Sequence, residues 1–208
     1  MKKLNPKVLK ITQAGILIAI MLIMDITKIG YLKFGLIEIT IMMIPVVIGA
    51  IMCGPAIGGL LGGIFGLTSL MQCFGQSAFG TFLMGINPLL TVIVCLLPRI
   101  LVGVFSGLIF KAIYKIDKTK IVSFAVATLS GALLNTLMFM GCLILFFWNN
   151  DAFITQMKSW SLPVDNLGTF LVAFVGINGV IEAIVCFIAG TIISKALVHF
   201  IPSNNNIK

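Results

Sequence analysis

Charged side chains are scarce in this sequence. Its 208 residues include only 14 lysines and arginines and six acidic residues, whereas 60% are hydrophobic. A soluble domain of this size cannot bury so much apolar surface, so lipid must be the solvent for most of the chain. The net charge of +8 does not indicate a nucleic-acid partner, because the basic residues lie in short clusters beside apolar runs, a pattern typical of membrane topology.

Residue types that carry catalysis are also rare. The single histidine, His199, lies near the C-terminal end, and the five cysteines are scattered without a CxxC pair or a spacing typical of metal sites. There is no GxSG motif with a histidine, no HExxH motif and no pair of carboxylates inside an apolar run. We therefore expect no catalytic residue, no metal site and no enzymatic activity.

Six apolar runs are present instead, and a helix of about 20 such residues crosses a bilayer. We expect one all-α integral membrane domain, 1–208, with spans at about 8–24, 39–53, 56–72, 88–113, 121–147 and 167–198. The second run is short, so we expect it to be tilted or only partly exposed to lipid. Between the runs lie a polar hinge at 25–38, a glycine-rich loop of little regular structure at 73–87 and a wetter segment at 148–166.

Lysine distribution sets the orientation of these six spans. Ten lysines fall on one side, which must be cytoplasmic by the positive-inside rule: Lys2, Lys3, Lys7, Lys10, Lys111, Lys115, Lys118, Lys120, Lys195 and Lys208. Both termini are then cytoplasmic, and the protein is a multi-pass protein of the cell membrane. The three long connections face outside, which predicts a pocket that opens outward under a roof of loops. The alternative is that these loops merely vary in length.

Arg99, the only arginine, lies within the run at 88–113 and is the first functional candidate. A cation at that depth costs at least about 2.5 kcal/mol on insertion scales, so it should face a partner, a cavity or a ligand. Glu182 and Asn135 lie at similar depth, within about one helical turn. We expect an Arg99–Glu182 ion pair completed by Asn135, acting either as a structural tie between two spans or as part of a substrate site.

Three further residues are candidates for binding a substrate. Asn178 lies one turn outward of Glu182 on the same helix face. Asn87 directly precedes Pro88, so it either caps that helix or contributes to an anion site at the helix start. Lys33 adds a positive charge to the outward side.

Small residues recur at four-residue spacing in two runs. Gly58, Gly62 and Gly66 predict close packing of the third span against a neighbouring helix. Gly15 and Ala19 give the first span a smooth strip, and spacing does not decide whether its partner helix belongs to this chain or to another.

The stretches ITIMMIPVVIGAIMCGPAIGGLLGGIFGLTSL (39–70) and NPLLTVIVCLLPRILVGVFSGLIFK (87–111), together with the six-span layout, resemble the S components of energy-coupling factor (ECF) vitamin transporters. The resemblance covers nearly the whole chain. It implies a substrate-binding subunit that captures a vitamin outside and docks on a transmembrane scaffold subunit driven by two ATPases. The chain itself would need no cofactor, since ATP is used by the partner subunits. The docking pair of alanines on the first span matches Gly15 and Ala19, with glycine in place of the first alanine.

The resemblance is greatest to pantothenate-type members, followed by riboflavin-type members. Pantothenate is a carboxylate, and the outward half offers lysines, Arg99 and asparagine amides to bind it. Riboflavin is larger and neutral and would use aromatic stacking, for which Phe79 and Phe174 are available. The alternative from another class is a self-sufficient secondary transporter or channel that uses Arg99 and Glu182 as a relay. Such proteins usually contain internal repeats, and we find none.

Overall fold

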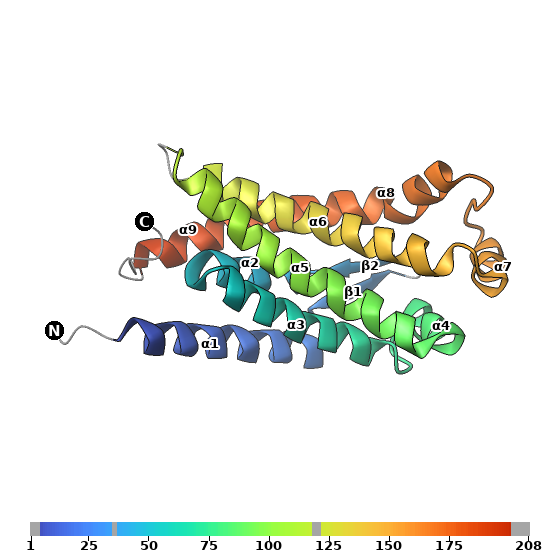
Figure 1. The fold of residues 1–208 in the computed structure, drawn as a ribbon, viewed down its shortest axis with the longest axis horizontal. Coiled ribbons are helices and arrows are strands. Elements are labelled where there is room, and N and C mark those ends of the chain that lie inside the picture. The colour runs from blue at the N-terminus through green and yellow to red at the C-terminus, as the bar shows by residue number, and fades with distance from the viewer. Residues whose placement is uncertain (1–4, 35–36, 118–121, 201–208) are drawn as a thin grey trace.

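The computed structural model describes residues 5–34, 37–117 and 122–200, and nearly all of them are helical, as the sequence predicts. The long helices run along one axis of the molecule (Figure 1). The start of α1 and the end of α9 lie at one end of the bundle, and two short helices, α4 and α7, lie at the opposite end (Figure 1).

Within the described residues, four helices are long and apolar enough to cross a membrane: α1 (Pro6–Ile26), α3 (Pro55–Gln72), α5 (Pro88–Tyr114) and α6 (Val122–Phe147). They agree closely with the predicted runs at 8–24, 56–72, 88–113 and 121–147. The last run, predicted at 167–198, forms α8 (Leu167–Val185), the π-helical turn η1 (Cys186–Gly190) and α9 (Thr191–Phe200). A bend of 42° separates 167–176 from 179–193, and by length and composition this bent pair is a fifth candidate span.

The predicted second span is not one helix. Ile39 and Thr40 belong instead to a short antiparallel hairpin, in which β1 (Tyr31–Phe34) pairs with β2 (Ile37–Thr40). The helix α2 (Met43–Cys53) has only 11 residues, about 17 Å, roughly half the thickness of a bilayer core. All of its residues are buried. The alternation of Ile37, Glu38, Ile39 and Thr40, which crosses the boundary between the predicted hinge and the predicted second span, was a strand signal.

Helices also occupy two segments predicted as loops. The segment 73–87, expected to have little regular structure, contains α4 (Ala78–Ile86), and the segment 148–166 contains α7 (Asp151–Ser159). Each begins at a capping side chain: Ser77 Oγ accepts from Gly80 N at 3.1 Å, and Asn150 Oδ1 accepts from Phe153 N at 3.2 Å. These caps allow short helices to form in glycine-rich or polar sequence.

The backbones of α3 and α5 are in direct contact, which confirms the prediction from the glycine spacing. A Cβ at Gly58 would overlap the carbonyl oxygen of Gly103, and one at Gly62 would overlap that of Arg99. Before α3, Gly54 adopts a φ of 101° and turns the chain sharply back from α2. Because the backbone of Arg99 is part of this contact, the close approach of the two helices fixes the position of Arg99 relative to α3.

We predict that Gly62→Ala destabilises the protein by about 1–3 kcal/mol, because the added methyl must push the two backbones apart. Thermal unfolding in detergent, read by circular dichroism, measures the effect. Gly63→Ala is the matched control, since a Cβ there meets only Ile100 Cγ1 at 3.8 Å, an ordinary contact. Equal stability of the two variants would contradict the close backbone contact.

Candidate functional site

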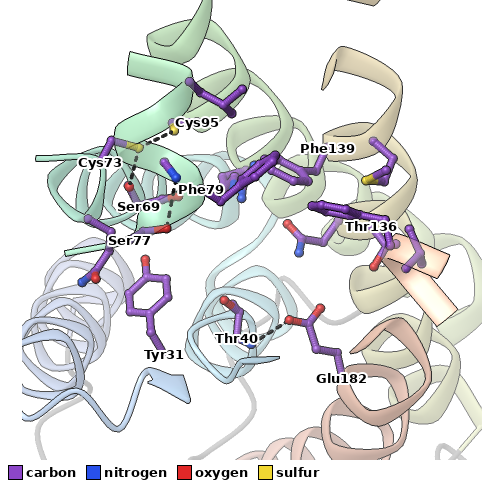
Figure 2. A pocket seen from close by; sticks show the side chains of 18 of the residues that line it. Tyr31, Thr40, Ser69, Cys73, Ser77, Phe79, Cys95, Thr136, Phe139 and Glu182 are labelled. Carbon is purple, nitrogen blue, oxygen red and sulfur yellow. Dashed lines mark hydrogen bonds between the residues drawn. The ribbon is translucent and has the colours of Figure 1, made fainter. Parts of the chain in front are cut away.

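A cavity of about 150 Å³ lies near the middle of the bundle. It is lined by residues of the hairpin, α3, α4, α5, α6 and α8, so that segments from most of the chain meet around it (Figures 1 and 2). Its polar wall includes Arg99, Asn135 and Glu182, three of the residues predicted from depth alone. These three side chains therefore lie around the same cavity.

Arg99 forms a hydrogen bond with the carbonyl group of Val94, which lacks its usual helical donor because residue 98 is proline. Proline has no N–H, so Pro98 cannot donate to the carbonyl of Val94 four residues earlier in α5. Arg99 Nη1 donates to Val94 O at 2.9 Å instead. The Pro98–Arg99 pair therefore satisfies a buried backbone carbonyl and bends the arginine side chain back along its helix.

Aromatic rings surround the rest of the guanidinium group. Arg99 Cζ lies 4.5 Å from the centroid of the Phe139 ring and 5.6 Å from that of Phe65, both within cation–π range. The Arg99 side chain is only 8% exposed, and its Nε, which is itself buried, has no hydrogen-bond partner among the described residues. Asn135 is 7% exposed, and its buried Oδ1 likewise has no partner among these residues. Two side chains that line the cavity therefore each contain one buried polar atom without a hydrogen bond.

Glu182 is bound to the hairpin rather than to Arg99. Its Oε1 accepts a hydrogen bond from Thr40 N at 2.6 Å, which joins α8 to the end of β2 (Figure 2). Among the residues described, no ion pair joins Arg99 to Glu182, so the prediction of a direct pair is wrong. The backbone N–H of Thr40 and the aromatic rings provide the separate partners that the two charges require.

The apolar wall of the cavity is aromatic. Phe79 of α4 and Phe174 of α8 lie with their ring centroids 5.1 Å apart, and Phe79 also lies 6.2 Å from Trp160. Phe139 of α6 covers another side, next to Arg99 (Figure 2). The cavity therefore combines a charged, hydrogen-bonding side with a ring-lined side.

Sequence reasoning missed the contribution of the hairpin and of the C-terminal end of α3. Tyr31 and Thr40, which are paired across the hairpin, both line the cavity. The Tyr31 hydroxyl shares a hydrogen bond of 2.9 Å with Thr68 Oγ1 of α3. Gln72 also lines the cavity, and its Nε2 donates to Asp25 Oδ1 at 2.9 Å. The alternating pattern in β2 indicated a strand, but nothing in it indicated a place inside the bundle.

Comparison with known proteins decides the family. Residues 9–194 match the family described as "ECF transporter, substrate-specific component". The chain belongs to this family. It is also 29% identical, over 175 residues that make up 81% of each chain, to a protein named pantothenate transporter PanT from Leuconostoc mesenteroides subsp. mesenteroides. Members of the family are the substrate-binding subunits of transporters rather than enzymes, and this S component is a multi-pass protein of the cell membrane.

The other residues predicted for the sites of this S component lie on α1, β1 and α8 and at the start of α5. Asn87 does not line the cavity; its Oδ1 accepts from Leu90 N at 3.1 Å and caps α5. Lys33 and Asn178 belong to β1 and α8, but their side chains lie outside the described residues. Gly15 and Ala19 are both exposed on α1, and a Cβ at Gly15 would meet no atom within 4 Å. The strip on α1 is therefore not used for packing within the described part of the chain.

We predict that Asn87→Ala lowers the free energy of unfolding of the S component by about 1 kcal/mol, because the N–H of Leu90 loses its acceptor. Asn87→Ser is the matched control and should retain most of the stability, since serine also caps helices. Thermal unfolding of both variants in the same detergent measures the difference. An alanine variant as stable as the serine variant would show that the cap contributes nothing.

Proposed function

We propose that this S component captures pantothenate on the outer side of the membrane and delivers it for ATP-driven uptake by a partner complex. The partner complex would be a transmembrane scaffold subunit with two ATPases. The S component would need no cofactor, because the ATPases use the nucleotide. The observation that carries the proposal is that Arg99 and Asn135 both line the cavity and each have a buried polar atom, Nε and Oδ1, without a hydrogen-bond partner among the described residues.

The chemistry of pantothenate complements these atoms. Its carboxylate supplies acceptors for the Arg99 guanidinium, and charge-assisted hydrogen bonds of this kind are the strong ones. Its hydroxyl and amide groups supply donors for Asn135 Oδ1. Its branched apolar part suits the ring-lined side formed by Phe79, Phe139 and Phe174. The relative named as a pantothenate transporter adds support from an independent direction.

Riboflavin is the second candidate, and the aromatic wall is the observation that favours it. A flavin ring could stack on Phe79 or Phe174. These two rings already pack on each other at 5.1 Å, and a neutral flavin would bring no charge to offset Arg99. The cavity therefore favours the anionic vitamin.

The membrane topology that we propose has six crossings with both termini cytoplasmic. Helices α1, α3, α5 and α6 would each cross once, and the bent α8–α9 segment would cross last. The second crossing would be shared by the hairpin and the short helix α2. The basic side chains Lys111, Lys115 and Lys195 then lie on the cytoplasmic side, as the positive-inside rule requires.

The exposed strip of α1 is the docking surface that we propose for the scaffold subunit. Gly15 and Ala19 lie on the side of α1 that faces away from the bundle, whereas Ala14, Leu17 and Met21 are buried against it. Small residues at this spacing allow another helix to approach closely within lipid.

We predict that Arg99→Met weakens pantothenate binding by about 10- to 100-fold, the effect of losing a hydrogen bond to a charged group. Calorimetric titration of the purified protein with pantothenate measures the dissociation constant. Asn87→Ala is the control and should leave it unchanged, because Asn87 lies outside the cavity. Tighter binding of riboflavin than of pantothenate by the unaltered protein would overturn the assignment of the vitamin, and proton-driven uptake into liposomes without ATP would overturn the transporter class.

We predict that Gly15→Trp abolishes co-purification with the scaffold subunit while leaving pantothenate affinity unchanged, because the indole fills the docking strip. Ile20→Trp is the matched control. Ile20 is also exposed but lies about 140° around α1 from Gly15, so its variant should still assemble. Equal recovery of the scaffold with both variants would exclude this strip as the docking surface.

A further inference from the structure

Two of the five cysteines face each other in the wall of the cavity. Cys73 lies at the C-terminal end of α3 and Cys95 lies on α5, and their sulfur atoms are 3.7 Å apart (Figure 2). Both residues line the cavity and both are 5% exposed. They are 22 residues apart in the sequence, so no motif signalled their meeting.

The backbone holds these two thiols close together. A Cβ at Gly66 would lie 2.9 Å from the carbonyl oxygen of Cys95, so α3 and α5 are in tight contact at this level. Cys73 Sγ donates to Ser69 O at 3.5 Å within α3. The same sulfur lies against Gly80 of α4, where a Cβ would meet it at 2.7 Å. Cys73 therefore sits at the junction of α3, α4 and α5.

We propose that Cys73 and Cys95 are a reversible disulfide site and that its oxidation restricts entry of substrate to the cavity. A peroxide is the oxidant. One thiol is oxidised to a sulfenic acid while the peroxide O–O bond breaks and water or an alcohol leaves; the second thiol then attacks that sulfur, forming the S–S bond and releasing water. Two electrons pass from the thiols to the peroxide, and an external dithiol reverses the reaction by exchange.

The geometry requires only a short movement to form the bond. The sulfur atoms must approach from 3.7 Å to about 2.05 Å, which side-chain rotation and small shifts of the Cys73 turn supply. The α4 end of the bundle lies opposite the start of α1 (Figure 1), which is the outward and oxidising side in the proposed topology. Oxidants outside the cell therefore have the shorter path to the pair.

The disulfide would restrain the movement of α4, which forms one wall of the cavity. It ties the end of α3, and with it the turn that leads into α4, to α5. Because α4 contributes Phe79, Gly80 and Leu83 to the cavity wall, fixing this junction hinders the opening that a ligand needs. This functional consequence rests on the proposed vitamin-binding role, whereas formation of the disulfide does not.

The chemical half is tested on the full chain in detergent. Protein treated with hydrogen peroxide is denatured, alkylated with N-ethylmaleimide and weighed by intact mass spectrometry. Two of the five thiols should become resistant to alkylation, peptide mapping should join Cys73 to Cys95, and dithiothreitol should restore both. Cys95→Ser should lose this response, whereas Cys142→Ser, altered outside the cavity, should retain it. Five reactive thiols, sulfinic acids, or a different linkage would overturn the proposal.

The functional half compares reduced and oxidised protein by stopped-flow tryptophan fluorescence. Association of pantothenate should be at least about 10-fold slower in the oxidised protein, because α4 and the turn before it cannot move aside to admit the ligand. The association rate should recover on reduction. An unchanged rate in protein shown to carry the disulfide would overturn the restriction of entry. Failure of the reduced protein to bind pantothenate refutes the vitamin assignment instead, and the mass measurement still decides the disulfide.

Discussion

The direct contact between the backbones of α3 and α5 is the constraint on which the site depends. Glycines at 58, 62 and 66 leave no side chain between the two helices, and the carbonyl oxygen of Arg99 itself lies against Gly62. In lipid there is little hydrophobic force between helices, so such close packing supplies much of their attraction. The same contact fixes the height and rotation of the turn that carries Arg99. The same contact places Cys95 beside Cys73. The position of Arg99 and the pairing of the two cysteines therefore both depend on the contact between α3 and α5.

Arg99 lies deep in the bundle, and it forms no ion pair with any carboxylate of the described residues. Pro98 leaves a carbonyl oxygen for it, and Phe139 and Phe65 present ring faces to it. These interactions stabilise the charge while Nε stays unpartnered. A salt bridge with Glu182 would have used that donor capacity inside the bundle. Because Glu182 is bound to Thr40 N instead, Nε of the guanidinium group is left without a partner among the described residues.

The hairpin is the least regular part of the bundle and contributes two residues to the site. Non-helical backbone is tolerated at membrane depth where it is buried in protein or lines a cavity. Here Tyr31 bonds to Thr68 on α3 and Thr40 bonds to Glu182 on α8, so side chains of the neighbouring helices hold both strands at the open end of the hairpin. A regular second span would have filled this space with side chains. The departure from helix is thus part of what forms the cavity.

The sequence by itself determined the four long apolar helices, the glycine contact and the shared depth of Arg99, Asn135 and Glu182, since each depends on local pattern or simple rise per residue. It also offered the cap at Asn87 as one of two roles, but it did not reveal that the predicted second span is a hairpin followed by a short helix. Only the tertiary structure decided the partners of those side chains. Glu182 bonds to a backbone amide 142 residues away, and Cys73 meets Cys95 across two helices. Every residue except proline has the same backbone N–H, so the sequence does not identify which one will be a partner. The rotation of a helix about its axis is set by its packing against neighbouring helices. Contacts of this kind therefore emerge only when the whole bundle is assembled.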